Sequence, residues 1–237
     1  MSCLNADLHI HTCLSPCGDE DMSPRNIIRT AKERNMQVIA ITDHNSTRNV
    51  KVCVELGIRN GIYVIPGCEV NTCEEVHCLC YFPDLQAMGE FQLYLDNRMT
   101  DVKNDPDKFG YQVAVDENDV IVYEEKRSLF IGIRDGVDNL ADEVHKLGGV
   151  FVPAHIDRPV NSLFSQLGFI PPGLKYDALE VSKHYFLDDF KKMHPELAGE
   201  YFIQNSDAHY TDDIAKAYNR FEMEDANWGC FRLLFNK

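Results

Sequence analysis

The sequence predicts an α/β fold whose strands run mainly parallel, and two observations support that prediction. Short apolar segments alternate with helix-like segments along most of the 237 residues, which is the pattern of strand–helix–strand units. Histidine and carboxylate side chains also stand where several apolar segments end, and parallel barrels gather their active-site residues at the carboxyl ends of their strands. The pattern corresponds to about seven strands.

Local signals define the elements of the first third of the chain. Ser23 and Pro24 are typical of a helix N-cap and a first helical position, and they predict a helix over residues 24–35. Residues 37–42 form a continuous apolar run, which suits a strand covered on both faces. The other elements expected here are strands at residues 6–12, 63–65 and 76–82 and a helix at about residues 47–58.

Residues 84–130 interrupt this alternation. A helix is expected at residues 85–99 and a short strand at residues 120–123, but the rest is polar and loop-like. We interpret the region as an insertion that acts as a lid or selects the substrate, within one domain of residues 1–237. The alternation then resumes with a helix at about residues 136–147, strands at residues 150–154, 179–181 and 201–204, and a closing helix from about residue 224.

The composition argues against some classes of partner. Long nucleic acids and anionic membranes bind basic surfaces, whereas the formal net charge here is −15. No apolar run approaches the ~20 residues of a membrane span, and we expect no signal peptide. The nine cysteines are odd in number and lie in strand-like segments. We therefore expect a reduced, cytoplasmic protein without disulfide bonds or a membrane partner.

The stretch Asp7-Leu8-His9-Ile10-His11 is the first chemical motif. As a strand, it places His9 and His11 on one face, where two imidazoles can bind one metal ion. Imidazole and carboxylate ligands together favour Zn²⁺, Mn²⁺ or Fe²⁺ over Ca²⁺ and Mg²⁺. Six imidazoles exceed the needs of one ion, so two or three divalent ions are expected. The candidate residues at or near strand ends are His9, His11, His44, His77, His155 and His209, with Asp43, Glu69 and Asp207.

Together these motifs resemble those of the PHP (polymerase and histidinol phosphatase) family. The resemblance implies a distorted seven-stranded (β/α) TIM-like barrel and a metal-dependent phosphoesterase with a trinuclear site. It spans residues 6–211. The motifs that carry it are His9-Ile10-His11, Thr42-Asp43-His44, Gly67-Cys68-Glu69, His155 and Ser206-Asp207-Ala208-His209.

The resemblance also implies a set of metal ligands. Asp43 would position ligands rather than bind a metal ion itself. Glu69 would bridge the first and second ions. The first ion would be held by His9, His11, Glu69 and Asp207, the second by Glu69, His77 and His155, and the third by His44 and His209.

The loop after the first motif is expected to supply a further ligand to the third ion. Many relatives carry a Ser-Asp-Gly sequence there, whereas this chain has Ser15-Pro16-Cys17-Gly18-Asp19. Asp19 stands five residues before Pro24, as the family's Asp stands before its helix proline. We therefore select Asp19 as the ligand, and Cys17 is its rival.

A phosphoesterase also needs positive charge for the phosphate. Arg158 follows His155 by three residues on the same loop, and arginine is suited to bidentate phosphate binding. Lys183 and His184 follow another strand and are expected at the same mouth.

The expected function is hydrolysis of a small phosphomonoester by metal-bound hydroxide, with Asp207, His209, Glu69 and Asp43 as the catalytic group. One alternative is a phosphodiesterase or 3′–5′ exonuclease acting on nucleotides or short oligonucleotides. An amidohydrolase ranks third, because its usual bridging lysine is not evident and Glu69 is. The non-enzymatic alternative is a barrel in which the metal ions are only structural.

Overall fold

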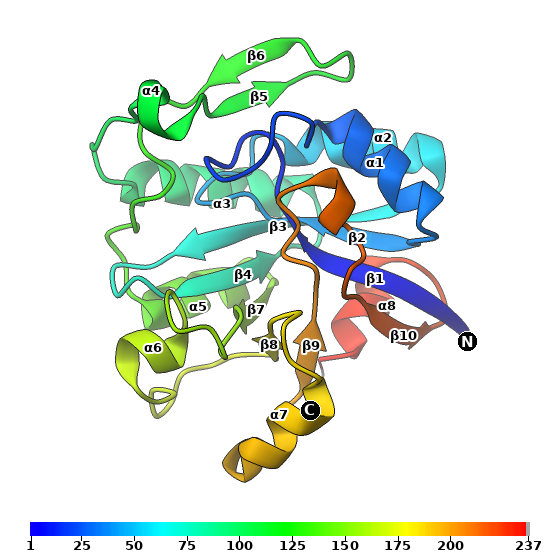
Figure 1. Cartoon of the computed structure of the whole chain (residues 1–237), viewed down its shortest axis with the longest axis vertical. Helices are drawn as coiled ribbons and strands as arrows, with labels where there is room; N and C mark the ends of the chain where they lie inside the picture. Colours follow the sequence, from blue (N-terminus) through cyan, green and yellow to red (C-terminus); the bar gives the residue numbers. More distant parts are fainter. Residues whose placement is uncertain (236–237) are drawn as a thin grey trace.

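The computed structural model describes residues 1–235, and its central feature is a curled sheet of six strands (Figure 1). The order across the sheet is β10–β1–β2–β3–β4–β7, and two further pairs of strands lie outside it, β5–β6 and β8–β9. The strands of the main sheet are β1 (Ser2–Ile10), β2 (Val38–Ile41), β3 (Tyr63–Asn71), β4 (His77–Tyr81), β7 (Val150–Pro153) and β10 (Asn219–Met223). The other strands are β5 (Val113–Val115), β6 (Ile121–Glu124), β8 (Leu179–Val181) and β9 (Phe202–Gln204).

The α/β class is confirmed, but the expectation of mainly parallel strands is wrong for the main sheet, because three of its five strand pairings are antiparallel, including that of β10 with β1. β1, β2 and β3 are parallel neighbours, whereas β4 is antiparallel to both β3 and β7. The reason is the length of the connection between β3 and β4. Residues 72–76 form a tight turn, and a parallel crossover needs a dozen residues or more.

The resemblance implied a distorted seven-stranded barrel, and the described residues form a curled, partial barrel whose main sheet has six strands. The parallel pair β8–β9 is not part of the six-stranded sheet, and hydrogen bonds near the strand ends join the two. The Ile156 amide donates to the Glu180 carbonyl at 2.9 Å, and the His11 amide donates to the Ala208 carbonyl at 3.0 Å. The regular ladders stop where His155 and Asp207 adopt positive φ angles of 30° and 47°. Such angles are costly for residues other than glycine and cluster at functional sites.

Helices cover the outer face of the curled sheet (Figure 1). The outer face packs residues such as Ile39 and Ile41 against the apolar sides of α1, α2, α3 and α5, while Val38 and Ala40 point into the interior. The helices are α1 (Pro24–Glu33), α2 (Val50–Asn60), α3 (Leu85–Arg98), α4 (Pro106–Phe109), α5 (Val137–Lys146), α6 (Leu163–Leu167), α7 (Leu187–Met193) and α8 (Trp228–Leu233). Two 3₁₀ turns, η1 (Pro195–Leu197) and η2 (Thr211–Asp213), complete the described elements.

The C-terminal segment closes the interior of the sheet. Phe231 of α8 is fully buried and lies edge-to-face on Tyr81, with ring centroids 5.9 Å apart. The helix expected from residue 224 is therefore present but shorter, and the strand before it, β10, was not anticipated. None of the helices in residues 1–235 combines the length and apolar character that a membrane span requires.

Residues 84–130 divide into two parts. α3 buries Phe91 and Leu95 in the main core, so it is built into the fold. α4 and the β5–β6 hairpin stand above it, at the side of the molecule where the loop after β1 also lies (Figure 1). The interpretation of residues 84–130 as an insertion within one domain stays a prediction.

Candidate metal centre

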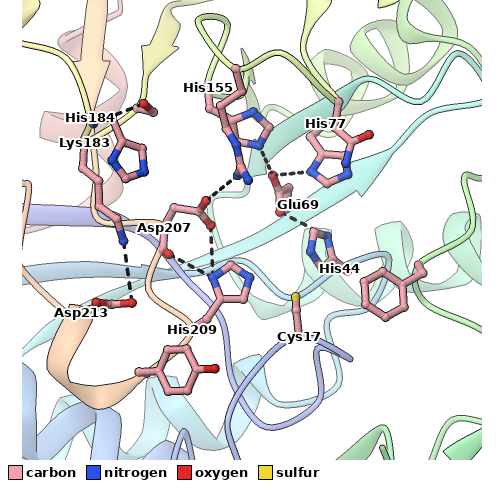
Figure 2. Close-up of a pocket in the computed structure, with 15 residues that line it drawn as sticks. Cys17, His44, Glu69, His77, His155, Lys183, His184, Asp207, His209 and Asp213 are labelled. Atoms are coloured by element: carbon pink, nitrogen blue, oxygen red, sulfur yellow. Dashed lines mark hydrogen bonds and ion pairs between the residues drawn. The ribbon is translucent and has the colours of Figure 1, made fainter. Parts of the chain in front are cut away.

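A pocket of about 410 Å³ opens where β1, β2, β3, β7 and β9 end, and most of the predicted site residues line it (Figure 2). His9 and His11 lie beneath its floor and are fully buried. The predicted residues that line the pocket are His44, Glu69, His77, His155, Arg158, Lys183, His184, Asp207 and His209.

Glu69 occupies the centre of the cluster and is 1% exposed. Its carboxylate oxygens face two different groups of imidazoles, as a bridging ligand requires. Burial raises its pKa, but the nearby His77, His9 and His44 outweigh burial, so the pKa lies well below its usual range and Glu69 is ionised. Oε2 lies 3.4 Å from His9 Nε2, 3.3 Å from His11 Nε2 and 3.1 Å from His44 Nδ1, and Oε1 lies 3.0 Å from His77 Nδ1 and 3.2 Å from His155 Nε2.

Asp207 closes the cluster from the opposite side. Its Oδ1 lies 3.4 Å from Nε2 of both His9 and His11, so the two imidazoles stand between Glu69 and Asp207. Burial raises the pKa of Asp207, but the surrounding imidazoles outweigh burial and hold that pKa well below its usual range. Two ionised carboxylates therefore flank one pair of imidazoles.

His9 and His11 also show that the cluster fits a cation. Nδ1 of His9 faces the carboxylate of Glu180 at 3.0 Å, and Nδ1 of His11 faces the Ser15 hydroxyl at 2.9 Å. Nδ1 of His9 donates to that carboxylate, and because Ser15 donates its own proton to Asp43 at 2.7 Å, Nδ1 of His11 donates to Ser15. Burial lowers the pKa of both rings, but the nearby carboxylates outweigh burial, so the pKa of His9 lies well above its usual value and that of His11 is raised to about 9. The two Nε2 atoms lie 3.2 Å apart beside Glu69 and Asp207, so the positive charge that gathers there could be supplied by a divalent metal ion instead of protons.

Glu180 is a site residue that sequence reasoning missed. It is 1% exposed on β8, and besides His9 it accepts hydrogen bonds from the His155 amide at 2.9 Å and the Asn205 amide group at 2.8 Å. A carboxylate that orients a metal-binding histidine is a common arrangement in metalloproteins. The sequence signal that could have identified Glu180 is the presence of an acidic residue inside a short, otherwise apolar strand.

Asp43 lies behind the cluster rather than in the pocket. It is fully buried and accepts three hydrogen bonds of 2.7 Å, from the Thr12 amide, the Thr12 hydroxyl and the Ser15 hydroxyl. It reaches His11 through Ser15, and the positioning role expected for it stays a prediction.

His44 and His209 are neutral imidazoles. Burial lowers the pKa of His44 well below its usual value, and burial together with the nearby His11 lowers the pKa of His209 to about 4. His209 donates from Nδ1 to the Asp207 carbonyl oxygen at 3.0 Å, so its Nε2 lone pair is free for a ligand bond. Both side chains are therefore suited to hold a metal ion.

Asp19, the loop residue selected from the sequence, does not line the pocket. Its carboxylate accepts a hydrogen bond from the Asp21 amide at 2.9 Å and so stabilises the loop. Its rival Cys17 does line the pocket, and its sulfur points toward the space between His44 and His209 (Figure 2). The pocket lining therefore favours Cys17 over Asp19 as the loop ligand, and the choice between them stays a prediction.

Positive charge at the pocket mouth is limited. Arg158 donates to Asp207 Oδ2 at 3.0 Å, and Lys183 Nζ lies 3.7 Å from Asp213 Oδ2. His184 lines the pocket as an exposed side chain. Each cation that lines the pocket is therefore matched by a carboxylate, and Glu69 adds a further negative charge. An anionic substrate would be repelled unless metal ions reversed that balance.

A family model of the PHP domain matches residues 7–222, which include every residue of the cluster. The chain belongs to the PHP family. The recognition from sequence motifs is thereby confirmed, and PHP proteins are metal-dependent hydrolases.

Relatives and solved structures agree with this family and fold. The uncharacterized protein YqxK of Bacillus subtilis is 24% identical over 98% of this chain and 62% of its own length. The lesion-specific endonuclease PfuEndoQ of Pyrococcus furiosus superposes with a TM-score of 0.77 at 21% identity, over 99% of this chain and 56% of that one. An Endonuclease Q complex with a 27-mer duplex carrying an abasic lesion superposes with a TM-score of 0.74 at 20% identity, over 98% of this chain and 56% of that one. The chain thus spans less than two thirds of each of these proteins.

Membership in a metal-dependent family agrees with the geometry of this PHP domain. Ligand atoms of His9, His11 and Glu69, and likewise those of His44, Glu69 and His77, all lie within 4.8 Å of one another. The buried histidine–glutamate clusters are therefore suited to divalent metal ions.

Proposed function

We propose that this PHP domain is a phosphoesterase whose substrate is a small phosphomonoester. The observation that carries the proposal is the position of Glu69 between two groups of imidazoles, with Arg158 and Lys183 on the wall of the same pocket. Such a site can hold adjacent metal ions and a phosphate group together.

The assignment of ligands is the one that the family resemblance implies, and the contacts of Glu69 with His9, His11, His77 and His155 support it. His9, His11 and Asp207 would share the first ion with Glu69 Oε2, and His77 and His155 would share the second with Glu69 Oε1. His44 and His209 would hold the third. When bound, the ions would polarise the phosphoryl oxygens and make water a stronger nucleophile at neutral pH.

The chain's own residues bind and orient the substrate. Arg158 uses one guanidinium nitrogen on Asp207, and its side chain is 41% exposed, so its other N–H groups can reach a phosphate oxygen. Lys183 and His184 offer further donors on the wall formed by the loop after β8. Asp43 and Glu180 act one step further away, by fixing the tautomers and ring positions of His11 and His9.

A nuclease is the second candidate function, because the fold is similar to that of a lesion-specific endonuclease, including a form bound to DNA. Phe130 and Tyr210 line the pocket and are 40% and 56% exposed, so a nucleobase could stack there. The net charge of −15 opposes binding of a long duplex. Short oligonucleotides are therefore the nucleic-acid substrates to test.

The experiment is a turnover assay with protein loaded separately with Zn²⁺, Mn²⁺ or Fe²⁺. The panel holds phosphomonoesters, phosphodiesters, short oligonucleotides and a duplex with an abasic site, and Glu69→Gln is assayed beside the wild type. Phosphate release from monoesters that is lost in Glu69→Gln supports the proposal. Cleavage of diesters or DNA alone would replace it with the nuclease. Metal-loaded protein without turnover of any member would favour the structural barrel.

A further inference from the structure

Cys17 lies among three of the clustered histidines. One ligand atom each from His11, Cys17, His44 and His209 can be chosen so that all lie within 4.8 Å of one another. That separation is comparable to the span of a single zinc coordination sphere, roughly 4 to 4.6 Å across for bonds of 2.0–2.3 Å. We propose that Cys17 is the loop ligand of the ion held by His44 and His209, and that its sulfur makes this position selective for zinc.

Backbone contacts hold the loop that carries the Cys17 sulfur in place. The Asp19 amide donates to the His209 carbonyl at 2.9 Å, and the Gly18 amide donates to the Ser15 carbonyl at 2.9 Å. A Cβ at Gly18 would collide with the Thr12 carbonyl oxygen, so glycine is required beside Cys17. The loop is thus tied to His209 by Asp19, and its own turn is closed by the hydrogen bond from Gly18 to Ser15.

The carboxylate that could compete with Cys17 is engaged elsewhere. Asp19 Oδ1 accepts a hydrogen bond from the Asp21 amide, and Asp19 is absent from the pocket lining formed by the described residues. The oxygen ligand expected from the sequence is thus replaced by sulfur in the fold.

Sulfur changes the metal preference of this position. Thiolate together with imidazole is a ligand set typical of Zn²⁺, whereas Mn²⁺ and Mg²⁺ prefer carboxylate, carbonyl and water oxygens. The positions around Glu69 and Asp207 carry imidazole and carboxylate instead. The cluster would therefore be mixed, with one sulfur-containing position and two that take several metals. Binding releases the thiol proton to solvent as the zinc–sulfur bond forms.

Cys13 in the same loop provides a matched control. Its thiol faces the Val113 carbonyl oxygen at 4.0 Å and lines a separate cavity beside the β5–β6 hairpin. Cys13→Ser therefore changes a thiol of the same loop, away from the histidines.

The test is X-ray absorption of the zinc-loaded protein together with cobalt substitution, and neither readout requires hydrolysis. We expect a sulfur scatterer at about 2.3 Å from zinc and a thiolate-to-cobalt charge-transfer band in the wild type. Cys17→Ser should lose both signals and about one bound ion per chain, whereas Cys13→Ser and Asp19→Asn should keep them. Signals that survive in Cys17→Ser, or are missing from the wild type, would overturn the proposal. Because the inference concerns metal binding alone, its failure is distinguishable from failure of the phosphoesterase proposal.

Discussion

The carboxylate of Glu180 lies against Nδ1 of His9, with its two oxygens at 3.0 and 3.1 Å, and both side chains are buried. This contact fixes the proton on Nδ1, so Nε2 is the atom that faces Glu69 and Asp207. Residues that orient a metal ligand in this way influence metal affinity without touching the ion.

We therefore expect Glu180→Gln to weaken metal binding by about 10- to 100-fold. The amide keeps the shape of the side chain but removes the charge that favours the correct tautomer of His9. Affinity can be measured by competition with a chromophoric chelator, and the exposed Glu222→Gln serves as the control. Equal affinities in Glu180→Gln and the wild type would show that Glu180 has only a packing role.

Removal of the metal ions should destabilise the fold. Without metal ions, the negative charges of Glu69 and Asp207 repel each other beside the buried His9 and His11. Ions present at about 100 times their dissociation constant would stabilise the native state by about 2.7 kcal/mol. Thermal unfolding should therefore shift to lower temperature after dialysis against a chelator and recover when Zn²⁺ is added back. An unchanged melting temperature would indicate that the cluster does not bind metal tightly.

Arg158→Ala should impair catalysis with little effect on stability. A hydrogen bond from a charged donor contributes about 1.5–3 kcal/mol, so we expect kcat/KM to fall roughly 10- to 100-fold. Arg134 is a suitable control, because it is also half exposed and pairs with a carboxylate, Asp101, at 3.2 Å. The measurement is kcat/KM of Arg158→Ala and of Arg134→Ala. Equal values for the two variants would show that Arg158 does not bind the substrate.

Much of the site could be predicted from the sequence because the motif residues stand at or near the ends of strands. His9, His11, His44, Glu69 and His155 all stand at the carboxyl ends of apolar runs, and the fold brings those ends together. Alternation along a strand indicates the face on which such residues lie, although the register of β1 is irregular between Asp7 and Ile10.

Other features depend on pairings that no local pattern encodes. The antiparallel direction of β4 was missed because β3 runs to Asn71, beyond the strand expected at residues 63–65, so that only the turn at residues 72–76 joins it to β4. The existence of β10 depends on its pairing with β1 and not on its own composition. Glu180 was missed for the same reason, since its role depends on His9, 171 positions away. That Cys17 lines the pocket and Asp19 does not depends on the path of the loop, which spacing alone does not define.

Asp177 provides a prediction about pH and stability away from the metal cluster. Burial raises its pKa, but hydrogen bonds from His145 at 2.8 Å and the Phe151 amide at 2.7 Å, together with Arg232, outweigh burial. The pKa of Asp177 therefore lies below its ordinary value of 3.8 in the folded protein. A lowered folded pKa stabilises the protein above the ordinary value, and this contribution is lost as the pH falls through the folded pKa.

Asp177→Asn should consequently destabilise the protein by about 1–3 kcal/mol at neutral pH and progressively less as the pH falls below the ordinary pKa of 3.8. Urea unfolding of both proteins at neutral pH and at a pH below 3.8 provides the comparison. The same free-energy difference at both would mean that the charge of Asp177 contributes nothing to stability.

The central claim is that the cluster around Glu69 binds divalent ions and uses them to hydrolyse phosphoesters. The most direct measurement is phosphate release from a phosphomonoester as metal-free protein is titrated with Zn²⁺ or Mn²⁺, with bound metal counted in the same samples. We predict that activity rises with the filling of the cluster and that Glu69→Gln shows neither full occupancy nor turnover. Full activity in metal-free protein, or in Glu69→Gln, would contradict the claim.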